Sequence, residues 1–249
     1  MNQYSGLSSV YDYLVSGVDF AGWIDYAELL LQHFGLKAAS VADIACGTGK
    51  TTFPFAQRGY KTYGVDISAS MIAVARNQAK AKNADISFLQ QDMRQFSLNE
   101  KVDLVTCFHD GLNYLTDIND MIKTFISVNK NLTNQGTFIF DLNTVIWLSD
   151  ADESINVIDE DDLTLIWQTS YNKDRKVWSI NLTGFFKEGD HYQKFKENHQ
   201  EKAYSREEII SCLNQAGLAL LGSFDAFKLV PAHEKSIRMF YVAQKINTL

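Results

Sequence analysis

The chain of 249 residues contains little proline and cysteine and no long apolar run. Its 2 prolines and 14 glycines argue against a collagen-like chain, a proline-rich linker or a turn-dense β-sandwich. The 3 cysteines lie far apart without CxxC or Cys/His spacing, which indicates buried free thiols in a reducing compartment. No run approaches the ~18–20 apolar residues of a membrane span, and the first residues do not resemble a signal peptide. We therefore expect a cytoplasmic protein without a membrane partner.

An excess of basic charge is also missing. Lysine and arginine total 23 against 30 aspartates and glutamates, which gives a net charge of −7. This charge would repel a phosphate backbone, so we expect no nucleic-acid partner. The length allows one large domain, or a core with a smaller lobe, at ~100–200 residues per domain.

Five short apolar segments alternate with helical stretches between residues 40 and 141. They lack strict polar–apolar alternation, as is typical of parallel strands that are buried on both faces. Helices are expected between them at 50–58, 69–82 and 118–132, with Ser68 as the N-cap of the second. This pattern predicts a doubly wound α/β sheet. Its expected strands are Val41–Ala45, Thr62–Val65, Ile86–Leu89, Leu104–Phe108 and Thr137–Asp141.

The segments that flank this region have other patterns. Residues 1–36 have the periodicity of two helices. After residue 141, three β-prone segments are separated by short turns, which makes them antiparallel neighbours. A capping box of Ser205 and Glu208 then begins a helix. The expected strands of this part are Leu163–Tyr171, Val177–Phe186, Tyr192–Tyr204, Leu218–Phe227 and Ile237–Gln244.

Together these patterns predict two units. The first is an α/β core of residues 1–149 and 205–249, built on a mostly parallel seven-stranded sheet. The second is a small antiparallel β lobe of residues 150–204, inserted after the fifth strand as a substrate lid or dimer surface. Both a monomer and a homodimer fit this reading.

The segment 43-DIACGTGKT-51 joins the first strand to the first helix of the core. Gly47 and Gly49 permit a tight turn before a helix N-terminus with unpaired N–H groups. A phosphate-binding P-loop would need glycine at position 44, which is isoleucine. A dinucleotide fingerprint would have its third glycine at Thr52. Asp43, at the strand tip, would repel a pyrophosphate and attract an ammonium or sulfonium group.

Two further carboxylates follow the next strands. Asp66 comes 19 residues after Gly47, close to the ~20 expected of an acid that binds ribose hydroxyls. NAD and S-adenosylmethionine (SAM) both contain this ribose, so Asp66 does not distinguish between the two cofactors. Asp92 is able to accept a hydrogen bond from an adenine amino group, and Ile67 and Met93 offer apolar faces to the ring.

The series DIACGTG, GVDIS, QQDM and QGTFIFDL resembles the motifs of class I SAM-dependent methyltransferases over about residues 38–145. Weaker similarity, through Tyr11-Asp12 and 199-HQEKAYSREEI-209, extends to bacterial small-molecule methyltransferases that include aminosugar N-methyltransferases. The resemblance implies a Rossmann-like fold, SAM as cofactor, S-adenosylhomocysteine as product and a small-molecule methyl acceptor, with methylation of a nitrogen or an oxygen.

The resemblance also implies roles for individual residues, with Cys46 standing where many relatives have glycine. The methionine part of SAM would meet Asp43, the backbone at Ala45, Gly47 and Gly49, and Phe108. The nucleoside would meet Asp66, Ile67, Met71, Asp92 and Met93. Tyr11 resembles the aromatic residue that closes over the cofactor, although a packing role on its helix is an equal alternative.

The segment 107-CFHDGLNY-114 follows the fourth strand, where ligands of open α/β sheets bind. His109 and Asp110 form a pair suited to proton transfer near pH 7, with His109 as base or substrate orienter, or as a plain polar loop residue. No cluster has metal-ligand spacing. Weaker candidates for the acceptor site are Asn113, Tyr114, Asn143, Trp147 and His199. An NAD-dependent oxidoreductase and a non-catalytic SAM-binding module remain as alternatives.

Overall fold

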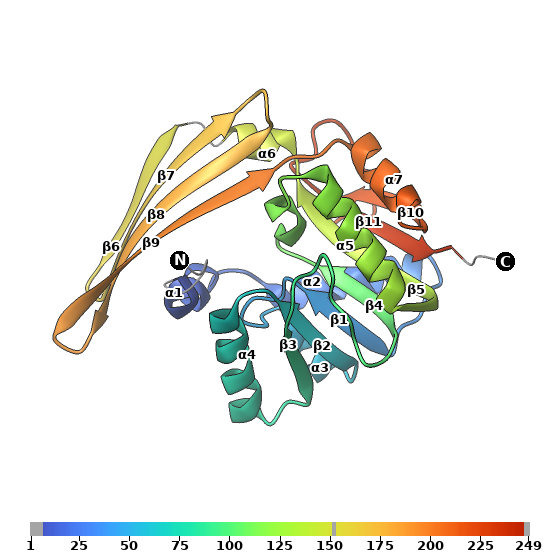
Figure 1. Ribbon diagram of the computed structural model, residues 1–249, viewed down its shortest axis with the longest axis horizontal. Coiled ribbons are helices and arrows are strands. Elements are labelled where there is room, and N and C mark those ends of the chain that lie inside the picture. Colours follow the sequence, from blue (N-terminus) through green and yellow to red (C-terminus); the bar gives the residue numbers. More distant parts are fainter. Residues whose placement is uncertain (1–6, 151–152, 247–249) are drawn as a thin grey trace.

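The computed structural model describes residues 7–150 and 153–246, with side chains from residue 11 onward. Its centre is a seven-stranded sheet with the strand order β10-β11-β5-β4-β1-β2-β3 (Figure 1). Neighbours from β5 to β3 pair in parallel, and β10 and β11 are antiparallel. The predicted mostly parallel α/β sheet is thereby confirmed. The strands are β1 (Ser40–Ile44), β2 (Lys61–Asp66), β3 (Ile86–Gln90), β4 (Val102–Cys107), β5 (Leu132–Asn143), β10 (Leu218–Asp225) and β11 (Arg238–Lys245).

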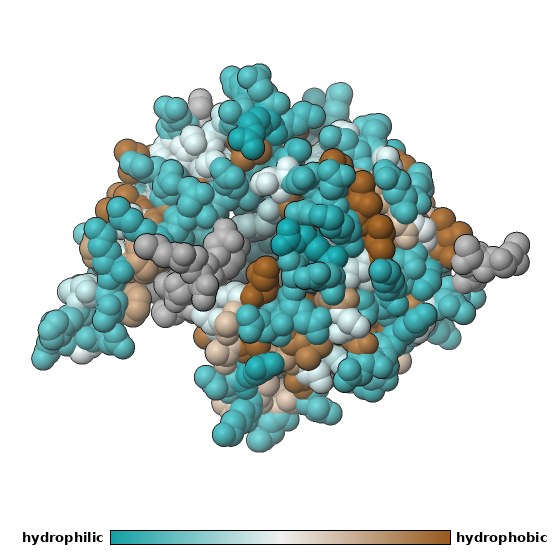
Figure 2. Space-filling view, viewed as in Figure 1, coloured by the Kyte–Doolittle hydropathy of each residue, from teal (hydrophilic) through white to brown (hydrophobic). Residues whose placement is uncertain are grey.

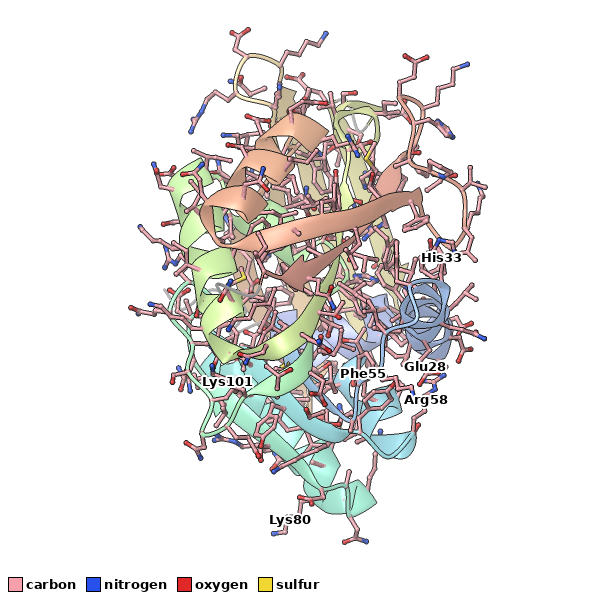
Figure 3. All side chains as sticks on the ribbon, turned by 90° about the vertical axis from the view of Figure 1, so that its right-hand side faces the viewer. Glu28, His33, Phe55, Arg58, Lys80 and Lys101 are labelled. Atoms are coloured by element: carbon pink, nitrogen blue, oxygen red, sulfur yellow. The ribbon has the colours of Figure 1, made fainter. Side chains whose placement is uncertain are left out.

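Helices cover both faces of this sheet. One face packs against apolar side chains of α5 (Ile118–Asn131) and α7 (Arg206–Gln215). On the other face lie α2 (Phe20–His33), α3 (Thr52–Gln57) and α4 (Ala69–Lys82). Figure 3 shows Arg58, which follows α3, pointing to Glu28 of α2, and the Nε–Oε2 distance is 3.5 Å.

Two of the helices begin at the capping residues that the sequence predicts. Ser68 Oγ accepts a hydrogen bond from the Met71 N–H at 3.3 Å and caps α4, as predicted. At α7 both bonds of the predicted capping box are present between Ser205 and Glu208. Two short elements were not predicted: a 3₁₀ turn, η1 (Gly111–Tyr114), and α6 (Val145–Asp150).

A second, separate sheet is antiparallel and has four strands in the order β6-β7-β8-β9. Its strands are β6 (Ser154–Glu160), β7 (Leu163–Asn172), β8 (Val177–Glu188) and β9 (His191–Lys202). Strand β6 was not predicted: its seven residues contain an alternating Ile155 and Val157, but they lie among polar and acidic residues. Strand β5 begins five residues before the predicted Thr137, and this start was missed because residues 133–136 are polar or glycine and give no apolar run.

The four-stranded sheet, called the outer sheet below, projects beside the carboxyl ends of the parallel strands. Helix α1 (Leu7–Leu14) lies between this sheet and the core (Figure 1). The face of the molecule in Figure 2 is mostly hydrophilic, with hydrophobic patches that include part of this outer sheet. Ile155 and Val157 of β6 are among its exposed apolar side chains, at 67% and 58% exposure.

Candidate active site

A cavity of about 530 Å³ lies at the turn of residues 45–49, called the glycine turn below. The end of β2, the segment after β4, helix α1 and strand β9 form its other walls. Its volume falls within the range of roughly 300–1,000 Å³ typical of small-molecule sites. Two other hollows, of about 640 and 750 Å³, lie near Lys101 and on the four-stranded sheet, and neither is lined by Ala45 or Gly47. The predicted site residues that line the central cavity are Tyr11, Ala45, Gly47, Asp66, Ile67, Met71, Asp92, Met93, His109 and Asp110.

The glycine turn has the tight backbone that the sequence predicted. Ala45, Gly47 and Gly49 have φ angles of 56°, 55° and 87°, in the left-handed region. A Cβ atom at Gly49 would approach Phe88 Cζ to 2.9 Å, so only glycine fits there without movement of the ring. At Gly47, the missing side chain keeps the backbone open toward the cavity.

Asp66 connects this turn to the end of β2. Its Oδ2 accepts a hydrogen bond from the Gly47 N–H at 2.8 Å, and its Oδ1 accepts one from the Ser68 N–H at 2.8 Å. Burial raises its pKa above the usual value, and the backbone donors oppose this effect. Next to it, Ile67 is 55% exposed and presents an apolar side chain to the cavity.

Asp43 lies behind the cavity wall and not on its surface. Its carboxylate accepts hydrogen bonds from the hydroxyls of Thr51 and Thr52, both at 2.7 Å, and of Thr106 at 3.0 Å. Burial raises its pKa to about 6 in spite of these donors. All three donors point the carboxylate into the protein, so a direct contact of Asp43 with the ligand stays a prediction.

Gly49 and Phe108 are two more expected ligand contacts that do not line the cavity. Gly49 packs against Phe88 and Phe53. The Phe108 ring is buried between Trp23 and Phe240, with centroid distances of 5.9 and 5.8 Å. Both residues support the wall of the site from behind.

Asp92 lines the cavity, but an arginine holds its carboxylate. Arg94 Nε lies 2.9 Å from each carboxylate oxygen, and its Nη1 lies 2.7 Å from Asp120 Oδ2. The pairing with Arg94 lowers the pKa of Asp92. Arg94 also lines the cavity, and the sequence analysis missed it.

Helix α1 closes one side of the cavity with Tyr11. This side chain lines the cavity and packs against the apolar cluster of Leu163, Leu165 and Leu182 in the outer sheet. The pKa of the Tyr11 phenol is raised by burial and by the carboxylates Asp110 and Asp66. Tyr11 thus combines the two roles that the sequence left open, cavity wall and packing.

Asp12 docks the same helix on the glycine turn. Its carboxylate accepts hydrogen bonds from Thr48 Oγ1 at 2.7 Å and Gln78 Nε2 at 2.8 Å, and it lies 3.0 Å from Lys50 Nζ. On the other side of α1, the hydroxyl of Tyr13 donates to Glu160 of β6. The helix is therefore tied to the core and to the outer sheet.

His109 and Asp110 both line the cavity and both have left-handed backbones, with φ of 61° and 59°. The His109 ring lies 5.1 Å from the ring of Trp23, centroid to centroid. Asp110 Oδ1 is 2.9 Å from Arg238 Nη2 but 3.9 Å from His109 Nδ1. The principal partner of Asp110 is thus the arginine and not the histidine with which it was paired from the sequence.

The weaker candidates for the acceptor site differ in whether they line the cavity. Tyr114 lines the cavity. Asn113 is fully buried and fastens β5 to β9, because its Nδ2 donates to the carbonyls of Asn143 at 3.1 Å and Lys202 at 2.9 Å. Trp147 is 48% exposed on α6, and His199 is buried 3.0 Å from Glu197; neither lines the cavity.

A buried polar cluster behind Asp110 escaped the sequence analysis. Arg238, in β11, pairs with Asp110 and with the fully buried Asp141. Beside them, Glu201 of β9 accepts a hydrogen bond from Asn143 Nδ2 at 3.3 Å. These residues come from four distant segments, so no local motif could indicate them.

Within residues 7–150 and 153–246, no group of three or more His, Cys, Asp or Glu side chains could hold a metal ion. The three cysteines are free and buried, as predicted. In the same part of the chain, no helix has the length and apolarity to cross a membrane.

Comparison with known proteins places this architecture. A family model described as a methyltransferase domain matches residues 41–136. The Bacillus subtilis protein YqeM, which is classed as a methyltransferase, is 32% identical over 248 residues, which cover 99% of this chain and 98% of YqeM. A SAM-dependent methyltransferase structure from Clostridium acetobutylicum is 28% identical, with a TM-score of 0.86 over 98% of this chain and 99% of that one. A sugar N-methyltransferase from a Streptoalloteichus species, 20% identical over 96% of this chain and 93% of its own, shares the fold with a TM-score of 0.78.

The fold and the matched domain define a class, the methyltransferases. The chain belongs to this family, and within it to the SAM-dependent enzymes with a Rossmann-like core. The expected family, enzyme class and cofactor are thereby confirmed, and the NAD-dependent oxidoreductase is set aside.

Proposed function

We propose that this chain transfers a methyl group to a nitrogen or oxygen of a small molecule bound in the central cavity. The observation that carries the proposal is the link between Gly47 and Asp66, which joins the open glycine turn to a carboxylate on the cavity wall. An arrangement of this kind suits the ribose of a nucleoside cofactor.

The residues present fit SAM. Asp66 would hold the ribose, the turn at Ala45 and Gly47 would take the methionine part, and the adenine would lie among Ile67, Met71, Asp92 and Met93. Asp43 and Gly49 would act through the shape of the turn, with Phe108 packed behind the wall. When bound, SAM supplies a methyl group on a positively charged sulfur.

The side chains of the protein would then align the reacting groups and shield them from water. Tyr11 and Val15 of the N-terminal segment cover the cavity, so water is kept from the reacting groups. His109 is the cavity residue whose side chain is suited to hold the proton of an acceptor or to orient it. Asn198 and Gln200 bring the outer sheet to the cavity, which supports a role for residues 150–204 on the acceptor side.

Titration calorimetry tests the cofactor part of the proposal. We expect micromolar binding of SAM and of S-adenosylhomocysteine, no binding of NAD, and loss of binding in Asp66→Ala. Asp190→Ala, in an exposed turn of the outer sheet, is the matched control and should bind as the wild type does. Binding that survives in Asp66→Ala would overturn the proposed site. Binding of SAM with no methyl transfer to any member of a panel of small amines and alcohols would favour a non-catalytic module.

A further inference from the structure

The polar cluster behind Asp110 contains more negative than positive groups. Asp110, Asp141 and Glu201 are buried or nearly so, and one guanidinium, that of Arg238, lies among them. Both terminal nitrogens of Arg238 are already engaged, one by Asp141 and one by Asp110. Glu201 is 3% exposed and has no ion-pair partner among the residues that the structure describes. A buried carboxylate without a cation is costly, so Glu201 holds a proton while no cation is near. Asp110 and Asp141 against the one guanidinium still leave one negative charge unbalanced.

Two buried hydrogen-bond acceptors of the same cluster also lack a donor in the described part of the chain. Asn143 is 3% exposed and directs its Nδ2 at Glu201, but its own Oδ1 has no partner in the described part of the chain. Asp141 Oδ1, fully buried, is unpaired in the same way. Unpaired buried acceptors call for a donor. An ammonium group has only donors, and it carries the missing positive charge.

The cluster reaches the central cavity through Asp110, which lines it, whereas Gln200 lines it from the strand face opposite to that of its neighbour Glu201. Gln200 directly precedes Glu201 in β9, and Asp110 begins the turn at η1. We infer that Asp110 and Glu201 form a subsite for the positively charged amine of the methyl acceptor, in which Asp110 contacts the amine and Glu201 is a positioning residue behind it. Before the transfer the ammonium gives one proton to His109, which lines the same cavity, so that its nitrogen has the lone pair that methyl transfer requires. The inference rests on the proposed function and narrows its acceptor to amines.

The ionisation of Glu201 fits this role. Burial, together with the neighbouring charges of Asp110 and Asp141, raises its pKa to about 8, while Asn143 and Arg238 oppose them. Below pH 8 Glu201 therefore holds a proton while the subsite contains no cation. A cation against Asp110 would favour the carboxylate form of Glu201, and the proton would pass to the solvent. Amine binding at pH 7 should thus release protons, and binding of an alcohol should not.

Calorimetry with cyclohexylamine and cyclohexanol, in the presence of S-adenosylhomocysteine, tests the subsite. The wild type should bind the amine about tenfold or more tightly than the alcohol, as hydrogen bonds to charged groups imply. Comparison of two buffers with different ionisation enthalpies should reveal the proton release. Asp110→Asn should remove the preference for the amine. Glu201→Gln should keep amine binding within a few-fold but abolish the proton release, and Glu201→Asp should restore it.

Two controls separate the sources of failure. His109→Gln should retain the proton release, because the released proton comes from Glu201 and not from a histidine. Binding of S-adenosylhomocysteine and thermal unfolding of each variant show whether the cofactor site and the fold are intact. Equal binding of amine and alcohol, no binding of the amine, or proton release that persists in Glu201→Gln would each overturn the subsite. Failure of the wild type to bind S-adenosylhomocysteine would instead overturn the proposed function.

Discussion

The carboxylate of Asp12 accepts a hydrogen bond from the hydroxyl of Thr48 at 2.7 Å, across 36 positions of the sequence. Thr48 lies between the two glycines of the turn, so this bond joins helix α1 directly to the segment that shapes the cavity. Burial raises the pKa of Asp12, but Thr48, Lys50 and Gln78 together lower it below the usual value. A carboxyl group with a lowered pKa contributes its stabilisation above its ordinary pKa of 3.8, and this is lost only as the pH falls through the lowered value. The helix is therefore held at neutral pH.

Asp12→Ala should loosen α1 and weaken SAM binding while the core stays folded. The variant loses hydrogen bonds to three side chains, and we expect the Kd for SAM to rise about three- to tenfold. Hydrogen exchange of α1 should become faster. Tyr13→Phe removes only the exposed contact with Glu160 and should leave the Kd almost unchanged. A Kd and an exchange rate of Asp12→Ala equal to those of the wild type would refute the docking role.

Gly49→Ala should destabilise the fold. At φ of 87° an alanine is strained, and its Cβ would lie 2.9 Å from Phe88 Cζ and 3.1 Å from Phe53 Cε2. We expect the free energy of unfolding to fall by about 1–3 kcal/mol, measured by urea denaturation. Gly35→Ala is the matched control, since φ there is 65° but no atom lies within 4 Å. Equal losses in the two variants would show that contact with the phenylalanine rings contributes nothing.

Asp43→Asn should change how stability depends on pH. Because the pKa of Asp43 is raised from 3.8 to about 6, the folded state binds more protons than the unfolded state between these values. Its contribution to stability is thus present below pH 4 and declines as the pH rises through 6. The full change corresponds to about 3 kcal/mol. Asparagine does not titrate, so the stability of Asp43→Asn relative to the wild type should increase from pH 4 to pH 7. Parallel curves from urea denaturation at several pH values would contradict this.

The parts of the site that follow from the sequence are those in which the partners are near in the chain or fixed by strand order. Asp66 could be placed because a parallel βαβ unit brings the ends of β1 and β2 together, and the Gly47–Asp66 bond reflects this. The caps at Ser68 and Ser205 are likewise local. Such features depend on backbone geometry that short motifs encode.

The rest of the site depends on contacts between distant segments. Asp110 and Arg238 are 128 positions apart, and nothing near either residue indicates the pairing. Asp43 was expected to meet the methionine part of SAM because its charge would attract a sulfonium and the family resemblance implies that contact. The hydroxyls of Thr51, Thr52 and Thr106 turn it inward instead, and only the packed structure reveals all three. Side-chain direction at a strand end is decided by such neighbours.

His109→Ala distinguishes proton transfer from alignment. His109 lines the cavity beside Trp23 and is not among the residues proposed to hold the cofactor, so the variant should bind SAM within about twofold of the wild type. If His109 takes a proton from the acceptor, turnover should fall by about 10²–10⁴-fold. The assay is formation of S-adenosylhomocysteine with a panel of small amines and alcohols. His191→Ala, exposed at the start of β9, is the control and should turn over normally. Unchanged turnover in His109→Ala would leave alignment and exclusion of water as the contribution of the chain, since a methyl acceptor that arrives deprotonated needs no base.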